Sequence, residues 1–250
     1  MLPNTRPTIT TLVIGADYTE SLSTCLKSKE AYAKKHGYTF IQGGEAFWDR
    51  NKPIAWSKIP FLLNVCESLP EGALIWQSDA DVLITNPELT VEEQILPLLH
   101  EDKDMLLTLD ACGHINSGNI LFRNTAWARD FWKRVGEMKQ FTYHLWWENA
   151  AMIALYAENK EDHDKIQITR EHKKFNAYLR AMPDEPSWEP NDFLVHFAGV
   201  YDLHMMQNLA VDCQKAKTVE EVPRLPMPPE EIAACEQARK DSFAVINKVF

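Results

Sequence analysis

The sequence predicts an α/β fold in which a mainly parallel sheet lies between layers of helices. Short β-branched and apolar runs alternate with longer helical patterns along most of the chain, as in folds built from strand–helix–strand units. The 250 residues and 45% hydrophobic content suffice to bury a full core, which favours one large domain over two small ones. No internal repeat is visible in the sequence.

Three apolar strands are predicted in the first half of the chain, each followed by a helical segment. They are rich in β-branched and aromatic residues and are expected over residues 8–14, 38–42 and 73–77. The helix before the third strand is expected over 57–69. Ser57 could cap this helix, and Pro60 can be accommodated only in its first turn.

Capping residues mark two other helices in this half. Asp17 and Glu20 have the spacing of a capping box, and Gly37 suits the C-terminal end of the helix that they would begin. Thr90 and Glu93 repeat the same pattern, and the proline four residues further on is expected to end or kink that helix.

The second half of the chain contains four further predicted strands, expected over residues 104–109, 119–123, 165–168 and 193–197. A helix capped by Asn124 or Thr125 follows the second of them, and another helical stretch is expected over 145–157. Residues 1–212 should form the main domain. Residues 213–250 should form a proline-rich linker and a terminal helix that packs on that domain.

The composition excludes several classes of protein. A net charge of −10 argues against a nucleic-acid partner, which would require clustered Lys and Arg, but a bound cation could still attract a small anion. No apolar run approaches the roughly 18 residues that span a bilayer, and the N-terminus lacks a signal-peptide pattern. Five widely spaced cysteines without a C-x-x-C pair, and the absence of glycosylation sequons, indicate reduced thiols in a cytoplasmic protein. A trimmed lumenal domain of a secretory-pathway enzyme would have a similar composition.

Two aspartates interrupt an apolar stretch at the end of the third predicted strand, in "LIWQSDADVLITNP". Alternation along an extended chain would aim Asp79 and Asp81 the same way, and a divalent cation such as Mg²⁺ or Mn²⁺ would offset their charges. An ordinary Asp-rich turn is the simpler alternative. The string also fits phosphatases of the haloacid-dehalogenase type, with Asp79 as nucleophile and Asp81 as acid/base. That motif normally opens its domain, whereas about 75 residues precede it here.

Three further segments carry polar residues that could line a site. Asn116, Ser117 and Gly118 are expected on a tight turn before a strand, where small polar groups suit sugar hydroxyls, although such turns are common. His196 stands in an apolar run with Gly199 three residues later; it could complete a metal site or be an ordinary core histidine. "WWENAAM" places a carboxylate and an amide at an apolar helix start, where a cap or surface role is the alternative.

In their order along the chain, these segments resemble glycosyltransferase family 34, which comprises galactosyl-, xylosyl- and mannosyltransferases of the GT-A fold. The resemblance spans roughly residues 8–205 and is carried by the ordered set of motifs, which is far more specific than any one of them. The motifs are "AWSKIPFLL", "WQSDADVLITNP", "NSGNILFRNTAWARDFW", "WWENAAM", "KKFNAY" and "DFLVHFAG".

The resemblance implies metal-dependent transfer of a sugar from a nucleotide-sugar donor, UDP being favoured over GDP, to a glycan or glycoside hydroxyl with retention of configuration. Asp81 and His196 match the ligands of Mn²⁺ or Mg²⁺, Asp79 would contact the metal or the ribose, and Lys58 would lie near the diphosphate. The donor would also be held by residues of three loops, namely Gly15, Ala16, Asp17, Asn116, Ser117, Gly118 and Gly199.

Two departures from the family pattern affect these expectations. Glu148 and Asn149 stand where the family has an acidic residue followed by glutamine, so the shorter amide leaves the catalytic reach toward the anomeric carbon open. Asn191 replaces a common glycine. The Phe-Asn-x-Tyr element around Asn176 is expected to be structural. A non-catalytic module that binds nucleotide sugars is therefore the alternative to an enzyme.

Overall fold

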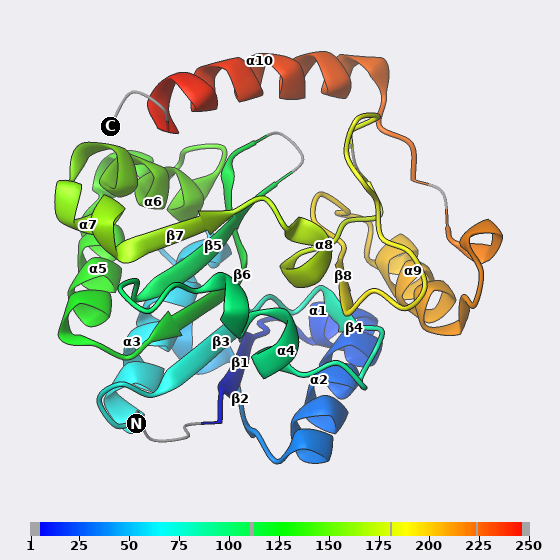
Figure 1. Cartoon of the computed structure of the whole chain (residues 1–250), viewed down its shortest axis with the longest axis horizontal. Coiled ribbons are helices and arrows are strands. Elements are labelled where there is room, and N and C mark those ends of the chain that lie inside the picture. Colours follow the sequence, from blue (N-terminus) through cyan, green and yellow to red (C-terminus); the bar gives the residue numbers. More distant parts are fainter. Residues whose placement is uncertain (1–5, 111–112, 181, 224, 247–250) are drawn as a thin grey trace.

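A computed structural model describes residues 6–110, 113–180, 182–223 and 225–246, and places a six-stranded sheet between two layers (Figure 1). The strand order is β2-β1-β3-β6-β5-β7, and three of the five pairings are parallel. Only β6 runs against both of its neighbours. The six strands are β1 (Thr8–Leu12), β2 (Thr39–Gly43), β3 (Leu74–Ser78), β5 (Met105–Leu109), β6 (Ile115–Arg123) and β7 (Ile166–Thr169). The predicted mainly parallel α/β sheet is confirmed.

Side chains alternate along the strands, so the two faces of the sheet pack against different helices. Ile75 and Phe122 face the core formed with α3 (Lys58–Ser68), α5 (Ala126–Glu137) and α6 (Trp147–Glu158). Trp76 and Leu121, one residue away on the same strands, face the core formed with α2 (Ser23–His36) and α4 (Val91–Gln94). This period of two, with both faces apolar, is what a sheet covered on each side requires.

Local signals explain where several helices begin and end. Thr90 and Glu93 form the predicted capping box of α4, Thr125 Oγ1 accepts a hydrogen bond from Ala128 N (3.2 Å) at the start of α5, and Gly37 ends α2 with φ +67°. The remaining helices are α1 (Ala16–Ser21), α7 (Lys160–Lys165), α8 (His172–Phe175), α9 (Leu203–Lys215) and α10 (Pro229–Ile246). Short 3-10 turns are η1 (Glu45–Phe47), η2 (Ile54–Ser57), η3 (Leu96–Leu98), η4 (Lys139–Phe141) and η5 (Val219–Glu221).

Two predicted caps are wrong. Gly15 is the residue before α1, so Asp17 lies inside the helix and cannot cap it, and the helical segment breaks at Leu22. Ser57 precedes α3 but makes no capping bond, because η2 has already given it helical backbone angles. Its hydroxyl has no hydrogen-bond partner among the described residues.

The predicted turn at Asn116–Gly118 is also wrong, because β6 starts four residues earlier than expected. Asn116 pairs with Thr108 of β5, next to an irregularity in that ladder, and Gly118 O accepts a hydrogen bond from Asp79 N at 2.7 Å. These small polar residues are therefore strand residues facing the end of β3. The pairing satisfies backbone groups that a turn would leave to solvent.

A small second sheet joins β4 (Val82–Ile84) to β8 (Leu194–His196). The pair is antiparallel, and its register sets His196 opposite Val82. Because β4 follows β3 after a short turn, this register brings residues about 115 positions apart in the chain to the same place. It is the contact that positions the site.

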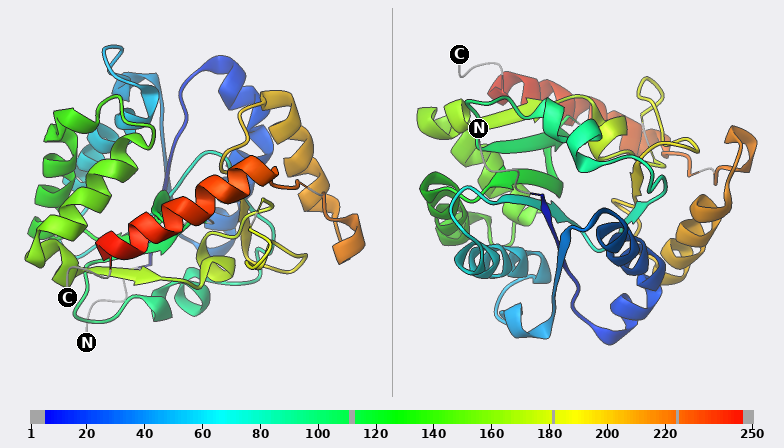
Figure 2. Two further views of the ribbon diagram at one scale, coloured as in Figure 1. Left: turned by 90° about the horizontal axis from the view of Figure 1, so that it is seen from above. Right: turned by 60° about the horizontal axis from the view of Figure 1, so that its bottom comes forward.

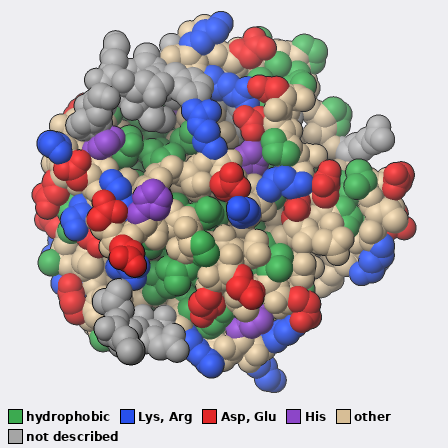
Figure 3. Space-filling model, viewed as in Figure 1, with side chains coloured by type: hydrophobic (Ala, Val, Ile, Leu, Met, Phe, Trp, Pro, Cys, Tyr) green, Lys and Arg blue, Asp and Glu red, His purple; other side chains and the backbone are tan. Residues whose placement is uncertain are grey.

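The C-terminal helix α10 crosses the molecule from the α9 side toward α6 and α7 (Figure 2). Arg239 pairs with Asp184 (2.8 Å) and Glu185 (2.9 Å), and Arg180 pairs with Glu231. In the described segments, no helix is both long and apolar enough for a bilayer crossing. Acidic and basic side chains alternate over the face seen in Figure 3.

The cysteines depart in part from expectation. Cys25, Cys66 and Cys213 are buried free thiols, but Cys235 is disulfide-bonded. The prediction of reduced thiols throughout is therefore wrong, and the cytoplasmic location that rested on it loses that support.

Candidate active site

Asp79, Asp81 and His196 converge just beyond the end of β3. One potential ligand atom from each lies within 4.8 Å of the others, and His196 Nε2 is 3.4 Å from Asp81 Oδ1. The backbone here is a turn closed by Val82 N donating to Asp79 O (3.1 Å), so the extended alternation predicted for the two aspartates is wrong. The carboxylates meet because the turn redirects Asp81 toward β8.

The charges of this group are only partly balanced within the protein. Burial would raise the pKa of Asp81, but His196 and Lys29 outweigh it and the pKa is lowered. Burial raises the pKa of Asp79, Lys58 opposes this, and the charge of Asp81 adds to the rise. Two carboxylates and an imidazole that face one another in this way fit Mg²⁺ or Mn²⁺. No downstream acidic pair of the phosphatase kind takes part in the described group.

A buried network fixes the ring of His196. Its Nδ1 lies 2.9 Å from Asn176 Oδ1, which also accepts from Asn119 Nδ2 (2.9 Å). An amide oxygen can only accept, so we assign the ring proton to Nδ1, which leaves the Nε2 lone pair facing Asp81. Asn176 Nδ2 in turn donates to Asn116 Oδ1 (2.9 Å). The polar neighbours of a metal-binding histidine set its orientation in this manner.

Gly118 leaves the space that the ring of His196 occupies. A Cβ on this glycine would lie 2.1 Å from His196 Cε1 and 2.7 Å from Nδ1. Neither the imidazole, which is 4% exposed, nor the paired strand could move aside easily. Gly118 is thus required by close packing against the histidine.

Lys58 links three elements to the same group. Its Nζ lies 2.9 Å from Asp79 Oδ1 and 3.2 Å from Glu148 Oε1, and it donates to Ser117 Oγ (2.9 Å). Burial would lower the pKa of Lys58, but the two carboxylates outweigh it and raise the pKa above the ordinary value. The charged ammonium of Lys58 therefore connects α3 with β6 and α6 through these bonds. Its predicted contact with a diphosphate stays a prediction.

Glu148 and Asn149 join the first turn of α6 to the start of β6 by hydrogen bonds. Glu148 Oε1 accepts from Ser117 Oγ (2.8 Å), and Asn149 Oδ1 accepts from Ser117 N (2.8 Å). Glu148 is 3% exposed, and its Oε2 has no hydrogen-bond partner among the described residues. The surface alternative for Glu148 is wrong. Trp147 before it has φ +42°, a strained conformation that needs such anchoring.

Within the described part of the chain, the other predicted donor residues make no hydrogen bond or ion pair with Asp79, Asp81 or His196. Gly15 ends the loop after β1 with φ +97°, and its N–H donates to Glu45 Oε1 (2.7 Å), while Ala16 and Asp17 begin α1. Since β1 lies beside β3 and runs parallel to it, both strands end at the same edge. Gly199 follows β8 with φ +77° and open space around its Cα.

Two residues near the aspartates were missed by sequence reasoning. Lys29 is fully buried in α2, and its Nζ donates to Ala80 O (3.2 Å) and Val82 O (2.5 Å), on either side of Asp81. The pKa of Tyr18 is raised by burial and further by the charges of Asp81 and Asp79. Helical spacing could have revealed Lys29, because it shares a face with the apolar Cys25 and Ala33.

Comparisons with known proteins place this geometry in context. The galactosyl transferase GMA12/MNN10 family model matches residues 9–102 and 97–203. An uncharacterized alpha-1,2-galactosyltransferase of Schizosaccharomyces pombe is 25% identical over 72% of this chain and 56% of its own length. A probable alpha-1,6-mannosyltransferase of Saccharomyces cerevisiae is 25% identical over 53% of this chain and 41% of its own. The chain spans about half the length of these curated relatives.

Two solved structures share the fold at 14% identity. A glycosyltransferase involved in glycosylation of the major capsid of PBCV-1 superposes with a TM-score of 0.63, over 82% of this chain and 98% of that one. The galactosyltransferase LgtC with donor and acceptor sugar analogs gives 0.51, over 91% and 99%. The fold is therefore the GT-A fold that the sequence resemblance implied. With the family model matching most of the sequence, the chain belongs to the galactosyl transferase GMA12/MNN10 family.

Proposed function

We propose that this chain is a metal-dependent, retaining glycosyltransferase that moves a hexose or pentose from a UDP-sugar, rather than a GDP-sugar, to a hydroxyl of a glycan or glycoside. The observation that carries the proposal is the Asp79–Asp81–His196 group beside the buried Glu148. In this scheme residues 1–212 form the transferase domain, and residues 213–250 are the linker and terminal helix.

One set of residues would act on the leaving diphosphate and another on the sugar. Asp81 and His196 would hold Mn²⁺ or Mg²⁺, with Asp79 on the metal or the ribose. The bound cation would neutralise the negative charge that grows on the departing diphosphate. Gly15, Ala16 and Asp17 would hold the base and ribose, while Asn116, Ser117 and Gly199 would flank the donor.

Glu148 would act on the sugar as positive charge develops at the anomeric carbon. Its Oε1 is held by Ser117 and Lys58, whereas its Oε2 is buried without a hydrogen-bond partner among the described residues. This second oxygen is the one that would stabilise the ring or orient the acceptor hydroxyl once substrate is bound. Both a front-face attack and a covalent glycosyl-enzyme intermediate accommodate a carboxylate in this position.

The test is release of nucleotide from a panel of UDP- and GDP-sugars with MnCl₂ and with excess EDTA. We expect hydrolysis or transfer from one UDP-sugar, lost in EDTA and in Asp81→Asn. Asp102→Asn is the matched control, because Asp102 is an exposed carboxylate near the opposite end of β5 and should leave activity unchanged. Full activity of Asp81→Asn in EDTA would contradict the proposal.

A second candidate is a module that binds a nucleotide sugar without turnover. Asn149 favours this candidate, because its amide oxygen already accepts a hydrogen bond from Ser117 N (2.8 Å) and is not free to contact a substrate. Titration calorimetry with UDP and MnCl₂ separates the two candidates. Metal-dependent binding without nucleotide release from any donor would support the module.

A further inference from the structure

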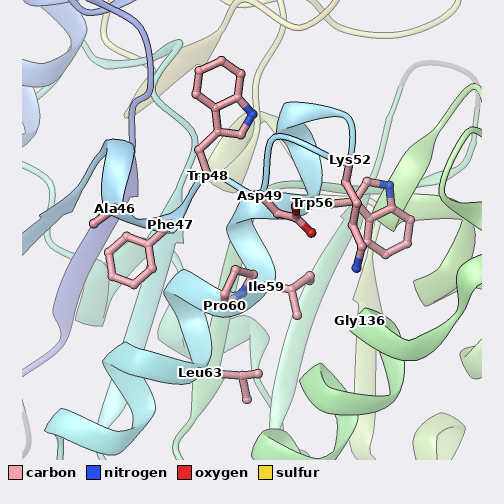
Figure 4. Close-up of a pocket in the computed structure, with 10 residues that line it drawn as sticks. All are labelled: Ala46, Phe47, Trp48, Asp49, Lys52, Trp56, Ile59, Pro60, Leu63 and Gly136. Atoms are coloured by element: carbon pink, nitrogen blue, oxygen red, sulfur yellow. The ribbon is translucent and has the colours of Figure 1, made fainter.

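A hollow of ≈ 460 Å³ lies on α3, away from the metal-binding group. Side chains of α3, among them Ile59 and Leu63, form its floor, and the segment that follows β2 supplies Trp48, Asp49 and Lys52 (Figure 4). Lys58, one residue before Ile59, turns instead toward Asp79. The hollow and the candidate active site therefore lie on different sides of the same helix. Its size is within the range of about 300–1,000 Å³ usual for small-molecule sites.

The lining of the hollow combines aromatic rings with isolated charges of both signs. The guanidinium of Arg50 lies 4.2 Å from the centre of the Trp48 ring, and the ammonium of Lys52 lies 6.0 Å from that of Trp56. Asp49 Oδ1 accepts from Asn51 N (3.0 Å) and Asn51 Nδ2 (3.1 Å), which orients the carboxylate. Indoles can pack on the C–H faces of a pyranose while a carboxylate and an ammonium bind its hydroxyls.

The mixed charges select the class of ligand. An ionised phosphate has no hydrogen to donate to Asp49, and a purely apolar ligand would desolvate Asp49 and Lys52 without partners. Lys52 forms no ion pair with any residue that the structure describes. A neutral polyhydroxylated ring meets both requirements.

The rim of the hollow is hydrogen-bonded to the segment that precedes α6, the helix that carries Glu148. Trp56 Nε1 donates to Thr142 O (3.0 Å), and Tyr143 OH donates to Asn51 O (3.4 Å). The chain then runs through 143–147 to Glu148, and Tyr143 and Leu145 are 81% and 79% exposed. Trp146 and Trp147 are also partly exposed (37% and 36%), so the segment carries a run of exposed apolar side chains, and contiguous patches of this kind are typical of interaction sites.

We propose that the hollow beside Trp48 and Trp56 is a saccharide-binding subsite for the part of an acceptor glycan remote from the hydroxyl that receives the sugar. This inference rests on the proposed function. It predicts that the protein discriminates acceptors by length, since a monosaccharide at Glu148 would leave the hollow empty.

The test measures binding of unmodified sugars, so it needs no turnover. Mannose, mannopentaose, glucose and cellopentaose are titrated into the protein with UDP and MnCl₂ by calorimetry and by ¹H–¹⁵N spectra of the tryptophan indoles. We expect one pentasaccharide to bind at least about tenfold more tightly than its monosaccharide, and to shift the indole signals of Trp48 and Trp56.

Two variants of different kind check the location. Trp48→Ala removes a ring, and Leu63→Trp fills the floor; each should abolish the length dependence, while Val219→Ala, an exposed apolar residue outside the hollow (59% exposed), should keep it. Equal affinity for short and long sugars, no binding of any of the four, or length dependence that survives Leu63→Trp overturns the proposal. Nucleotide release is assayed separately, so loss of the proposed function and loss of the subsite are distinguishable.

Discussion

The ammonium of Lys29 lies beneath the turn that carries Asp79 and Asp81, with no access to solvent. It bonds the carbonyls on both sides of Asp81, so it fixes the turn that delivers the carboxylate. Burial lowers the pKa of Lys29 from 10.5 to about 8, because the charged form is poorly solvated there. Lys29 therefore fixes the turn, but burying its charge lowers the free energy of unfolding, and this loss depends on pH.

Lys29→Met tests this cost through the pH dependence of stability. Between the folded pKa of about 8 and the unfolded value of 10.5, the folded protein has released a proton that the unfolded chain keeps, so stability rises with pH. We expect the free energy of unfolding of the unsubstituted protein, relative to Lys29→Met, to increase by roughly 2 kcal/mol between pH 7.5 and 10. Urea denaturation at both pH values measures it, and a pH-independent difference would contradict it.

Gly118→Ala tests the packing of His196, the proposed metal ligand. The new methyl group would collide with the His196 ring at 2.1 Å, so we expect about 2 kcal/mol of destabilisation and at least tenfold weaker Mn²⁺ binding. Gly44→Ala is the control, because its Cβ would have 3.7 Å to the nearest heavy atom. Unchanged Mn²⁺ affinity in Gly118→Ala would show that His196 is not a ligand.

At the scale of elements, a buried carboxylate joins α5 to α7. Asp162 is fully buried and accepts from Trp127 Nε1 (3.0 Å) and from both terminal nitrogens of Arg134 (2.5 and 2.6 Å). These bonds hold α7 against α5, and none of them involves Asp79, Asp81 or His196.

Asp162→Ala should destabilise the protein by about 1–2 kcal/mol, because it removes the acceptor of Trp127 Nε1 and one of the two carboxylates paired with Arg134, which is 26% exposed and keeps Asp130. The control is Asp164→Ala, whose carboxylate is 53% exposed and pairs with Lys160 and His163 close by in the chain; we expect little change in stability there, because solvent screens such pairs. Denaturation midpoints check both, and the affinity for Mn²⁺ should not change in either variant.

Most elements could be predicted from the sequence because their signals are local. The β-branched and apolar runs located β1, β3 and β5, and Thr90 and Thr125 marked helix starts through bonds to residues three positions away. The direction of β6 could not be predicted, since it depends on pairing with strands far away in the chain. The bond between Asn176 and His196 likewise depends on how β8 docks on β4.

At the scale of the whole molecule, the site is assembled from segments that span most of the chain, from Lys29 to His196. A ligand that bridges these segments in the folded state binds nothing comparable in the unfolded chain. Its binding free energy is therefore added to the stability of the entire core.

Thermal unfolding with and without UDP and MnCl₂ tests this coupling. At ligand concentrations about 100-fold above the dissociation constant, stabilisation should approach roughly 2.7 kcal/mol. Chelation with EDTA should remove it, and Asp81→Asn should lack it at every concentration. A midpoint that rises equally in Asp81→Asn would place the nucleotide away from the triad.

The reversed direction of β6 has a consequence for how such a protein can diversify. Since β6 runs against β3 and β5, its first residues lie at the edge of the sheet where β3 ends, and Ser117 and Gly118 there contact Lys58 and His196. The last residues of β6 pair with the start of β3, at the far edge of the sheet. Substitutions at that far edge can therefore accumulate without altering the residues next to the carboxylates.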